Sequence, residues 1–160
     1  INIAETDLGP RGIDKLEFML AANKGEASKP LRKVASGGEM SRLMLALKSA
    51  FAQADDVTTL IFDEIDAGVG GAVAGQVAGR IAALAKTHQV ICVTHLPQIA
   101  AAASRHFNVA KSTSRGRTKT EVRLVEDALR VDEVARLLDG KATDLSLQHA
   151  EALLKKSGAA

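Results

Sequence analysis

The sequence predicts an α/β fold whose core is a parallel sheet. Residues 57–62 and 89–94 are two mostly apolar runs rich in β-branched side chains, a pattern typical of strands buried on both faces. Between them, a glycine-rich turn leads into a segment with apolar residues at helical spacing: Val73, Val77, Ile81 and Leu84. Strand, helix and strand within residues 57–94 form a βαβ unit, so we expect two parallel strands in a sheet covered on both faces.

The segment before this unit predicts one strand and one helix. Leu16, Phe18 and Leu20 alternate, which favours a strand over the short helix that the same stretch also allows. Residues 24–30 are polar and contain Gly and Pro, so they predict a loop. Ser36 is a candidate helix N-cap. The helix that follows, closed at residues 54–56, carries five apolar residues on one face: Met40, Leu43, Met44, Leu47 and Phe51.

The segment after the unit predicts a hairpin and flanking helices. Residues 98–106 favour a helix. Residues 106–125 form two extended segments around a polar Ser-Arg-Gly-Arg turn, which predicts a β-hairpin. Two helices follow, at about 129–139, ended by Gly140, and at about 144–156. The last helix is amphipathic, and we expect its apolar side to pack on the core.

Length and composition are those of one globular domain. The 160 residues are 46% hydrophobic and 25% charged, and no secretory signal or bilayer-spanning apolar stretch occurs. A net charge of +2 does not by itself indicate nucleic-acid binding, and 2% aromatic content argues against a base-stacking platform. A single cysteine, Cys92, excludes an internal disulfide and fits a reducing compartment. Because the chain begins with Ile1, we expect one piece of a longer protein.

Ser36, Gly37 and Gly38 directly precede the first long helix, and this arrangement is typical of an anion-binding site. Small residues let backbone N–H groups approach an anion, and the helix directs its positive end towards it. No Lys-Ser or Lys-Thr follows the glycines, so this is not a P-loop. The sequence therefore predicts a phosphate contact that lacks the lysine of a complete nucleotide site.

Both predicted core strands end in residues suited to phosphate hydrolysis. Asp63 and Glu64 end the first strand, and His95 ends the second. Ligands bind beyond the carboxyl ends of parallel strands, where adjacent residues point in different directions. One acid can then hold Mg²⁺ through water while the next faces the attacking water, and His95 can donate a hydrogen bond to a phosphate.

Each of these features also has an ordinary structural interpretation. A paired Asp-Glu at a strand end serves as a helix cap or solvated turn about as often as it serves a functional site. A lone His at a strand end is more often structural than functional. The combination of Asp63, Glu64 and His95 with the Ser-Gly-Gly helix start favours the functional interpretation. His88, His106 and His149 have no metal-ligand spacing, and we expect them to be structural.

Four motifs in order resemble those of ABC ATPases. Residues 35–42, "ASGGEMSR", resemble the signature motif, and 59–64, "TLIFDE", resemble a Walker B strand with its catalytic Glu. "IDAGVGG" stands where the D-loop would be, and "VTH" is similar to the H-loop. Glu39 after the glycines resembles the SMC-type ATPases. The chain is most similar to the SMC-like RecN family of bacterial DNA-repair proteins, through "FDEIDAGVGG", "VTHLPQIAA" and the tail "VARLLDGKATDLSLQHAEALL". The resemblance runs from about Phe18 to the end of the chain.

The resemblance implies a split ATPase head. Residues 1–160 would be its single C-terminal lobe, an ABC-type P-loop NTPase half without the P-loop lobe and the coiled coil. It implies that Asp63 helps to hold Mg²⁺, Glu64 is the general base and His95 senses the γ-phosphate of ATP. Ser36, Gly37 and Gly38 would act in trans on ATP held by a second protomer, with Glu39 shaping the turn and Asp66 of the D-loop reaching across the dimer interface.

The implied function is ATP-driven head dimerisation in the repair of DNA double-strand breaks. The implied partners are the P-loop lobe of the same protein, a second copy and DNA, with no membrane, and the implied location is the bacterial cytoplasm at the nucleoid. We expect residues 1–160 alone to be inactive as an ATPase and to associate weakly. The head of an SMC chromosome-organising ATPase and a non-hydrolysing dimerisation module are the alternatives, followed by a transporter domain.

The predicted hairpin contains the most basic local stretch of the sequence. One interpretation is contact with the phosphate backbone of DNA. The other, which is the more frequent role of such a stretch, is a solvated edge that charge protects from pairing. The residues concerned are Lys111, Arg115, Arg117, Lys119 and Arg123.

Overall fold

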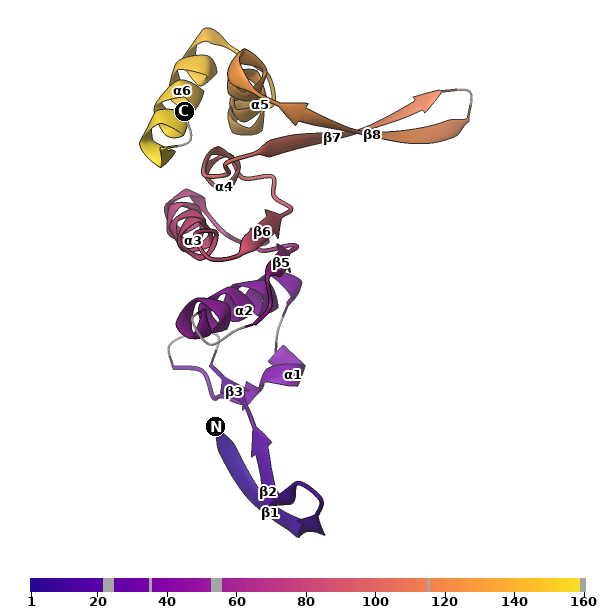
Figure 1. The fold of residues 1–160 in the computed structure, drawn as a ribbon, viewed down its shortest axis with the longest axis vertical. Helices are drawn as coiled ribbons and strands as arrows, with labels where there is room; N and C mark the ends of the chain where they lie inside the picture. Colours follow the sequence, from indigo (N-terminus) through magenta and orange to yellow (C-terminus); the bar gives the residue numbers. More distant parts are fainter. Residues whose placement is uncertain (22–24, 35, 53–55, 115, 159–160) are drawn as a thin grey trace.

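The computed structural model describes residues 1–21, 25–34, 36–52, 56–114 and 116–158. The molecule is elongated, with an N-terminal β-hairpin at one end and two packed helices at the other (Figure 1). The βαβ unit lies between these ends, and a second hairpin projects sideways next to the C-terminal helices (Figure 1). The fold class is α/β, as the sequence predicts.

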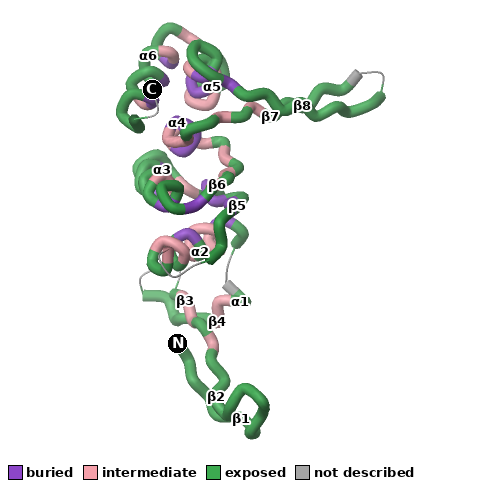
Figure 2. The backbone as a smooth tube through the Cα atoms, viewed as in Figure 1, coloured by how far each residue is buried: buried purple, intermediate pink, exposed green. Residues whose placement is uncertain are grey.

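Short antiparallel strands make up the N-terminal end. β1 (Asn2–Gly9) pairs with β2 (Gly12–Glu17), and β3 (Met19–Leu20) pairs with β4 (Lys29–Pro30), after which α1 (Leu31–Val34) begins. The strand predicted around Leu16 to Leu20 is confirmed as β2 and β3, whereas β1 was not predicted. All of β1 is exposed, so burial does not position this hairpin (Figure 2).

The predicted βαβ unit is confirmed. Helix α2 (Gly37–Phe51) leads to β5 (Thr59–Phe62), α3 (Gly71–Leu84) and β6 (Gln89–Cys92). β5 and β6 are parallel, in the register Thr59 to Gln89 through Phe62 to Cys92. The backbone N–H of Val93 donates to the Phe62 carbonyl at 2.9 Å, so both strands end at the same level and the loops that follow them start side by side.

Only one face of this two-stranded sheet is covered, so the prediction of a sheet covered on both faces was wrong for the residues that the structure describes. The covered face packs against α2 and α3 in a core of Leu45, Leu60, Phe62, Ile65, Val77, Ala78, Leu84 and Ile99. On the other face, Ile61 is 69% exposed and Ile91 is 47% exposed. The residues alternate along β5, with Leu60 and Phe62 buried and their neighbours not, because only one side of the sheet has a helical layer.

Helix α2 also leaves apolar surface uncovered. Leu45 is its buried large side chain, whereas Met44, Leu47 and Phe51 of the predicted apolar face are exposed. Apolar side chains are thus exposed both on α2 and on the open face of β5 and β6.

Helix α4 (Pro97–Ala101) is shorter than the helix predicted over 98–106. The buried Arg130 side chain donates hydrogen bonds to the carbonyls of Ala101, at 3.3 Å, and Ala103, at 2.5 Å. The Ser157 hydroxyl donates to the Ala101 carbonyl as well, at 2.7 Å. These donors from two later helices satisfy carbonyls at the end of α4, so the chain turns there and enters a strand at His106.

The C-terminal end is a hairpin with two helices at its root. β7 (His106–Ser114) pairs with β8 (Arg117–Val125), and α5 (Asp127–Asp139) and α6 (Asp144–Ser157) follow, all as predicted. Gly140 ends α5 with φ +78°, a left-handed conformation that favours glycine. The apolar side of α6 packs on α5, as expected, in a second core of Ala101, Val134, Ala135, Ala150 and Leu154.

Across the ranges that the structure describes, the helices are too short or too polar for any of them to traverse a lipid bilayer.

Candidate functional site

The N-terminus of α2 is held by reciprocal side-chain caps. The Glu39 N–H donates to Ser36 Oγ at 3.3 Å, and the Ser36 N–H donates to Glu39 Oε2 at 3.1 Å. This capping box confirms Ser36 as the predicted N-cap. The helix therefore starts at a fixed residue, and its positive end faces the loop after β5.

Gly37 and Gly38 allow α2 to approach this loop closely. A Cβ atom on Gly38 would lie 2.8 Å from Ala67 Cβ and 2.9 Å from the carbonyl oxygens of Ala67 and Glu64. A Cβ atom on Gly37 would collide with the Glu64 carboxylate. The two glycines thus have a packing role that the sequence analysis did not include, and they bring the predicted anion site next to the predicted base.

Ser41 and Arg42 bind the backbone of the same loop, and sequence reasoning missed both. Ser41 Oγ donates to the Asp63 carbonyl at 2.6 Å. Arg42 donates from one nitrogen, Nη1, to the carbonyls of Ile65 at 3.2 Å and Ala67 at 2.8 Å. The only signal in the sequence is their position, one turn after the glycines on the helix. These bonds fix the loop of residues 63–67 to α2.

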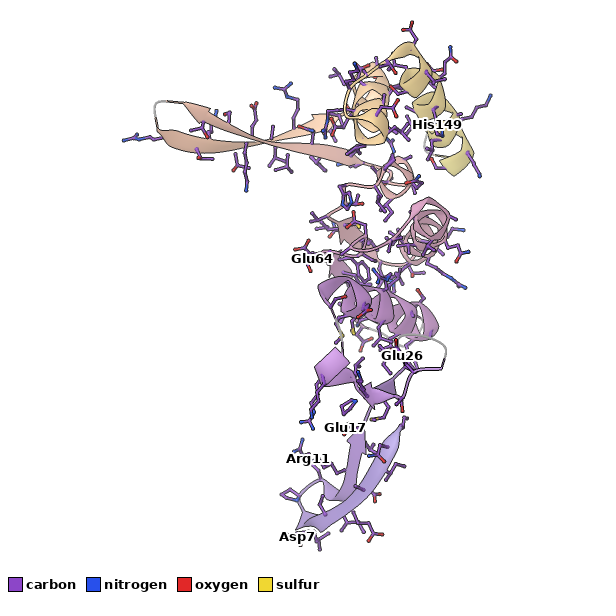
Figure 3. The ribbon with its side chains drawn as sticks, turned by 180° about the vertical axis from the view of Figure 1, so that it is seen from behind. Asp7, Arg11, Glu17, Glu26, Glu64 and His149 are labelled. Carbon is purple, nitrogen blue, oxygen red and sulfur yellow. The ribbon has the colours of Figure 1, made fainter. Side chains whose placement is uncertain are left out.

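Asp63 and Glu64 are both exposed at the carboxyl end of β5. Asp63 Oδ1 accepts a hydrogen bond from the Glu64 N–H at 2.9 Å. Glu64 has φ +56°, a left-handed conformation that costs a non-glycine residue on the order of 1 kcal/mol. Its side chain lies on the side of the molecule towards which the β7–β8 hairpin projects (Figure 3).

The donor set at this strand end fits Mg²⁺ with one protein carboxylate. Within the described ranges, no group of three or more His, Cys, Asp or Glu side chains could enclose a metal ion. Mg²⁺ commonly keeps several waters and takes one or two carboxylates plus substrate phosphates. An exposed carboxylate at Asp63 is compatible with that mode, in which water and phosphate would supply the other ligands.

Asp66 joins the loop after β5 to the loop after β6. Its Oδ2 accepts hydrogen bonds from Thr94 Oγ1 at 2.6 Å and from the His95 N–H at 2.7 Å. His95 Nδ1 lies 2.9 Å from the same oxygen. The Asp66 side chain is 6% exposed and that of His95 is 74% exposed. The buried carboxylate therefore orients an accessible imidazole whose Nε2 lies on the ring edge away from Asp66.

The hydrogen bonds determine the charge state of Asp66. Burial raises the pKa of its carboxyl, but hydrogen bonds from Thr94 and from the His95 N–H, together with the charge of His95, lower it by more. The net pKa lies below its ordinary value, so Asp66 is ionised at neutral pH.

This geometry differs from the expectation that Asp66 reaches across a dimer interface. Its carboxylate is buried and bound to Thr94 and His95 of the same chain. A contact with a second copy would require breaking these bonds and leaving the His95 N–H without its acceptor.

Cys92 does not add a nucleophile to the site. Burial, together with the negative charges of Asp66 and Asp63, raises the pKa of its thiol to about 11. The thiol is therefore protonated at neutral pH and unreactive.

The structure brings most of the predicted site residues together at one edge of the sheet. Ser36 to Glu39, Asp63, Glu64, Asp66 and His95 are connected through α2 and the two loops. The basic residues of the hairpin lie apart from this edge, on β7 and β8. Arg115 lies outside the described residues.

Comparison with curated proteins finds relatives along nearly the whole chain. "DNA repair protein RecN" of Bacillus subtilis is 46% identical over 158 residues, which is 98% of this chain and 27% of that protein. "DNA repair protein RecN" of Treponema pallidum is 49% identical over 153 residues, 95% of this chain and 27% of that protein. The chain thus spans about a quarter of the length of these relatives.

Other comparisons add little. No protein-family model matches the chain. A chain from the structural study "Structural biochemistry of ATP-driven dimerization and DNA stimulated activation of SMC ATPases" is 25% identical, with a TM-score of 0.43, over 62% of this chain and 60% of that one.

Gly38→Ala should destabilise the protein because backbone atoms of the loop at 64–67 would have to move away from α2. We expect a loss of about 1–3 kcal/mol in the free energy of unfolding. Urea unfolding measures it, with Gly79→Ala as the control, since a Cβ there meets nothing within 4 Å. Alanine in place of that helical glycine should be neutral or stabilise by up to about 1 kcal/mol. Equal effects of the two substitutions would contradict the close approach.

Asp66→Asn should destabilise the protein in a pH-dependent way. The depressed pKa of Asp66 means that its contribution is fully present above the ordinary carboxyl pKa and is lost as pH falls through the folded-state pKa. At pH 7 we expect a loss of about 1–3 kcal/mol, because an amide cannot accept all of these hydrogen bonds. The difference from wild type should shrink below about pH 4. Urea unfolding at pH 7 and pH 3 tests this, with the exposed Asp132→Asn as control, and a pH-independent difference would contradict it.

Proposed function

The chain belongs to the RecN family of DNA repair proteins and corresponds to about a quarter of the length of each relative. We propose that it forms one lobe of an ATP-hydrolysing head that acts in DNA repair. The observation that carries the proposal is the meeting of three groups at one sheet edge. These are the capped N-terminus of α2, the carboxylates after β5 and the histidine after β6. The carboxylates and the histidine can act on one phosphate, as metal ligand, base and hydrogen-bond donor, while the adjacent helix N-terminus can bind the phosphate of a second nucleotide.

Each group has a separate task in the proposed site. Asp63 would help to hold Mg²⁺, which would supply positive charge to neutralise the phosphates. Glu64 accepts a proton from the attacking water. The imidazole of His95, held at Nδ1 by Asp66, donates from Nε2 to the γ-phosphate when it is protonated.

Ser36, Gly37 and Gly38 complete a site whose nucleotide is held by a second copy. The backbone N–H groups at the start of α2, together with the helix dipole, bind the γ-phosphate. Since no P-loop motif occurs in residues 1–160, the nucleotide is held mainly by polypeptide outside this chain. Head dimerisation therefore depends on ATP, because a ligand that binds only the dimer stabilises it.

The uncovered apolar surface supports a P-loop lobe as the neighbour within the same protein. Ile61, Ile91 and Val93 on the open face of the sheet are exposed. The relatives extend well beyond the aligned quarter, so they contain polypeptide that could cover this face. In the complete protein, we place the head in the bacterial cytoplasm, at the nucleoid, with DNA as a partner. Residues 1–160 alone should not hydrolyse ATP.

Glu64→Gln in the complete protein tests the proposed base. The amide cannot accept the proton of the attacking water, so kcat for ATP hydrolysis should fall by on the order of 100-fold or more. ATP binding, measured with a fluorescent analogue, should persist, because Gln keeps the size of the side chain.

Glu151→Gln is the matched control, since this exposed glutamate lies on α6, away from the site. Its kcat should equal that of wild type. A Glu64→Gln protein that hydrolyses ATP near the wild-type rate would overturn the assignment. A wild-type protein that binds ATP without hydrolysing it would indicate a dimerisation module instead.

A further inference from the structure

The β7–β8 hairpin has two chemically different faces. In an antiparallel pair, directly opposite residues lie on the same face and successive residues alternate. Arg117, Lys119, Glu121 and Arg123 of β8 therefore share one face, here called the cationic face. Their partners Ser112, Ala110 and Asn108 on β7 lie on it too.

The opposite face is mostly apolar near the root of the hairpin. Phe107 pairs with Leu124, and Val109 pairs with Val122. Lys111 pairs with Thr120 on this face, so the structure separates it from the other basic residues with which the sequence analysis grouped it.

The cationic face carries an excess of positive charge on an exposed strand. β8 contains three basic residues and one acid, and all of them are exposed. Arg123 forms an ion pair with Glu121 at 3.4 Å, which partly offsets one charge at the inner half of the strand. The positive charge is thus concentrated at Arg117 and Lys119, towards the tip.

The spacing of these residues matches a regular polyanion. Alternate residues of a strand are about 6.8 Å apart, at about 3.4 Å per residue. One strand of B-DNA carries a regular row of phosphate charges, about one per 3.4 Å of helix axis, so two cations on alternate residues of β8 can each contact a phosphate of the same strand. A two-stranded ribbon also fits against a duplex groove.

The composition of this face indicates contact with the backbone of the duplex and not with bases. It carries no aromatic side chain, so it offers no platform on which a base could stack. Arginine, lysine and serine are typical phosphate ligands, which position a protein on DNA without reading its sequence.

The root of the hairpin is fixed to α5, so the tip is presented in a defined direction. Glu133 of α5 is bound by Arg136 at 2.9 and 2.7 Å, and it also accepts a side-chain hydrogen bond from Asn108 of β7. The hairpin projects away from the helices on the side where Glu64 lies (Figures 1 and 3).

We propose that the cationic face of the β7–β8 hairpin binds the phosphate backbone of duplex DNA through Arg117 and Lys119. This inference rests on the proposed function for the presence of DNA and adds the surface that contacts it.

The test compares Lys119→Ala with Lys111→Ala in the complete protein. Both remove one exposed lysine from the same hairpin, but from opposite faces. Affinity for a duplex of mixed sequence is measured over a range of salt concentrations, and log K is plotted against log [salt]. Lys119→Ala should reduce the magnitude of the slope by about 0.9, the value for one lost phosphate contact. Lys111→Ala should leave the slope unchanged.

Arg117→Ala provides a second variant. In the double variant that combines it with Lys119→Ala, the magnitude of the slope should decrease by about 1.8, twice the value for one contact. Equal loss in Lys111→Ala and Lys119→Ala would overturn the assignment to one face. An unchanged slope in Lys119→Ala would also overturn it, and would assign the cationic face to another partner, such as an acidic protein surface. Absence of DNA binding by the wild-type protein would contradict the proposed function itself, whereas ATP hydrolysis without DNA should be the same in all variants.

Discussion

The arrangement of the site depends on one buried carboxylate. Asp66 accepts hydrogen bonds from Thr94 and His95, which follow the neighbouring strand, and so joins the two loops beyond the parallel sheet. A buried carboxylate depends on its hydrogen-bond donors, because each donor that is lost leaves the desolvated charge less compensated and lowers the stability of the fold. The position of the His95 ring therefore depends on the position of the loop after β5. Since that loop also contains Asp63 and Glu64, the acid pair and the histidine are oriented as one unit.

The N-terminus of α2 is attached to the same unit by close packing and by hydrogen bonds to backbone carbonyls. Gly38 leaves no room for a side chain against Ala67, and Arg42 donates to the carbonyls of Ile65 and Ala67. A shift of α2 caused by an anion at its N-terminus would therefore move the loop that carries the acids. The contact between Gly37 and the Glu64 side chain has the same consequence, since it links the proposed phosphate contact with one nucleotide to the proposed base that acts on the other.

Local patterns in the sequence predict the elements well, and tertiary contacts explain most of the differences. The parallel pair β5–β6, the N-cap at Ser36 and the β7–β8 hairpin follow from periodicity and capping chemistry, which act within a few residues. The early end of α4 depends on Arg130, which is distant in sequence and donates to its last carbonyls. The contacts of Ser41 with the loop, and the open face of the sheet, likewise depend on which elements pack together. Strand register separates Lys111 from Lys119, and a count of basic residues carries no such information.

In the proposed assembly, these residues build half of a shared hydrolytic site. The decisive measurement is a structure of the complete protein with Mg²⁺ and a non-hydrolysable ATP analogue. We expect the γ-phosphate to lie against Asp63, Glu64 and His95 of one copy and against Ser36, Gly37 and Gly38 of a second copy. A nucleotide bound away from both sets of residues, with the sheet edge at Asp63 and His95 covered by protein, would rule out the shared site.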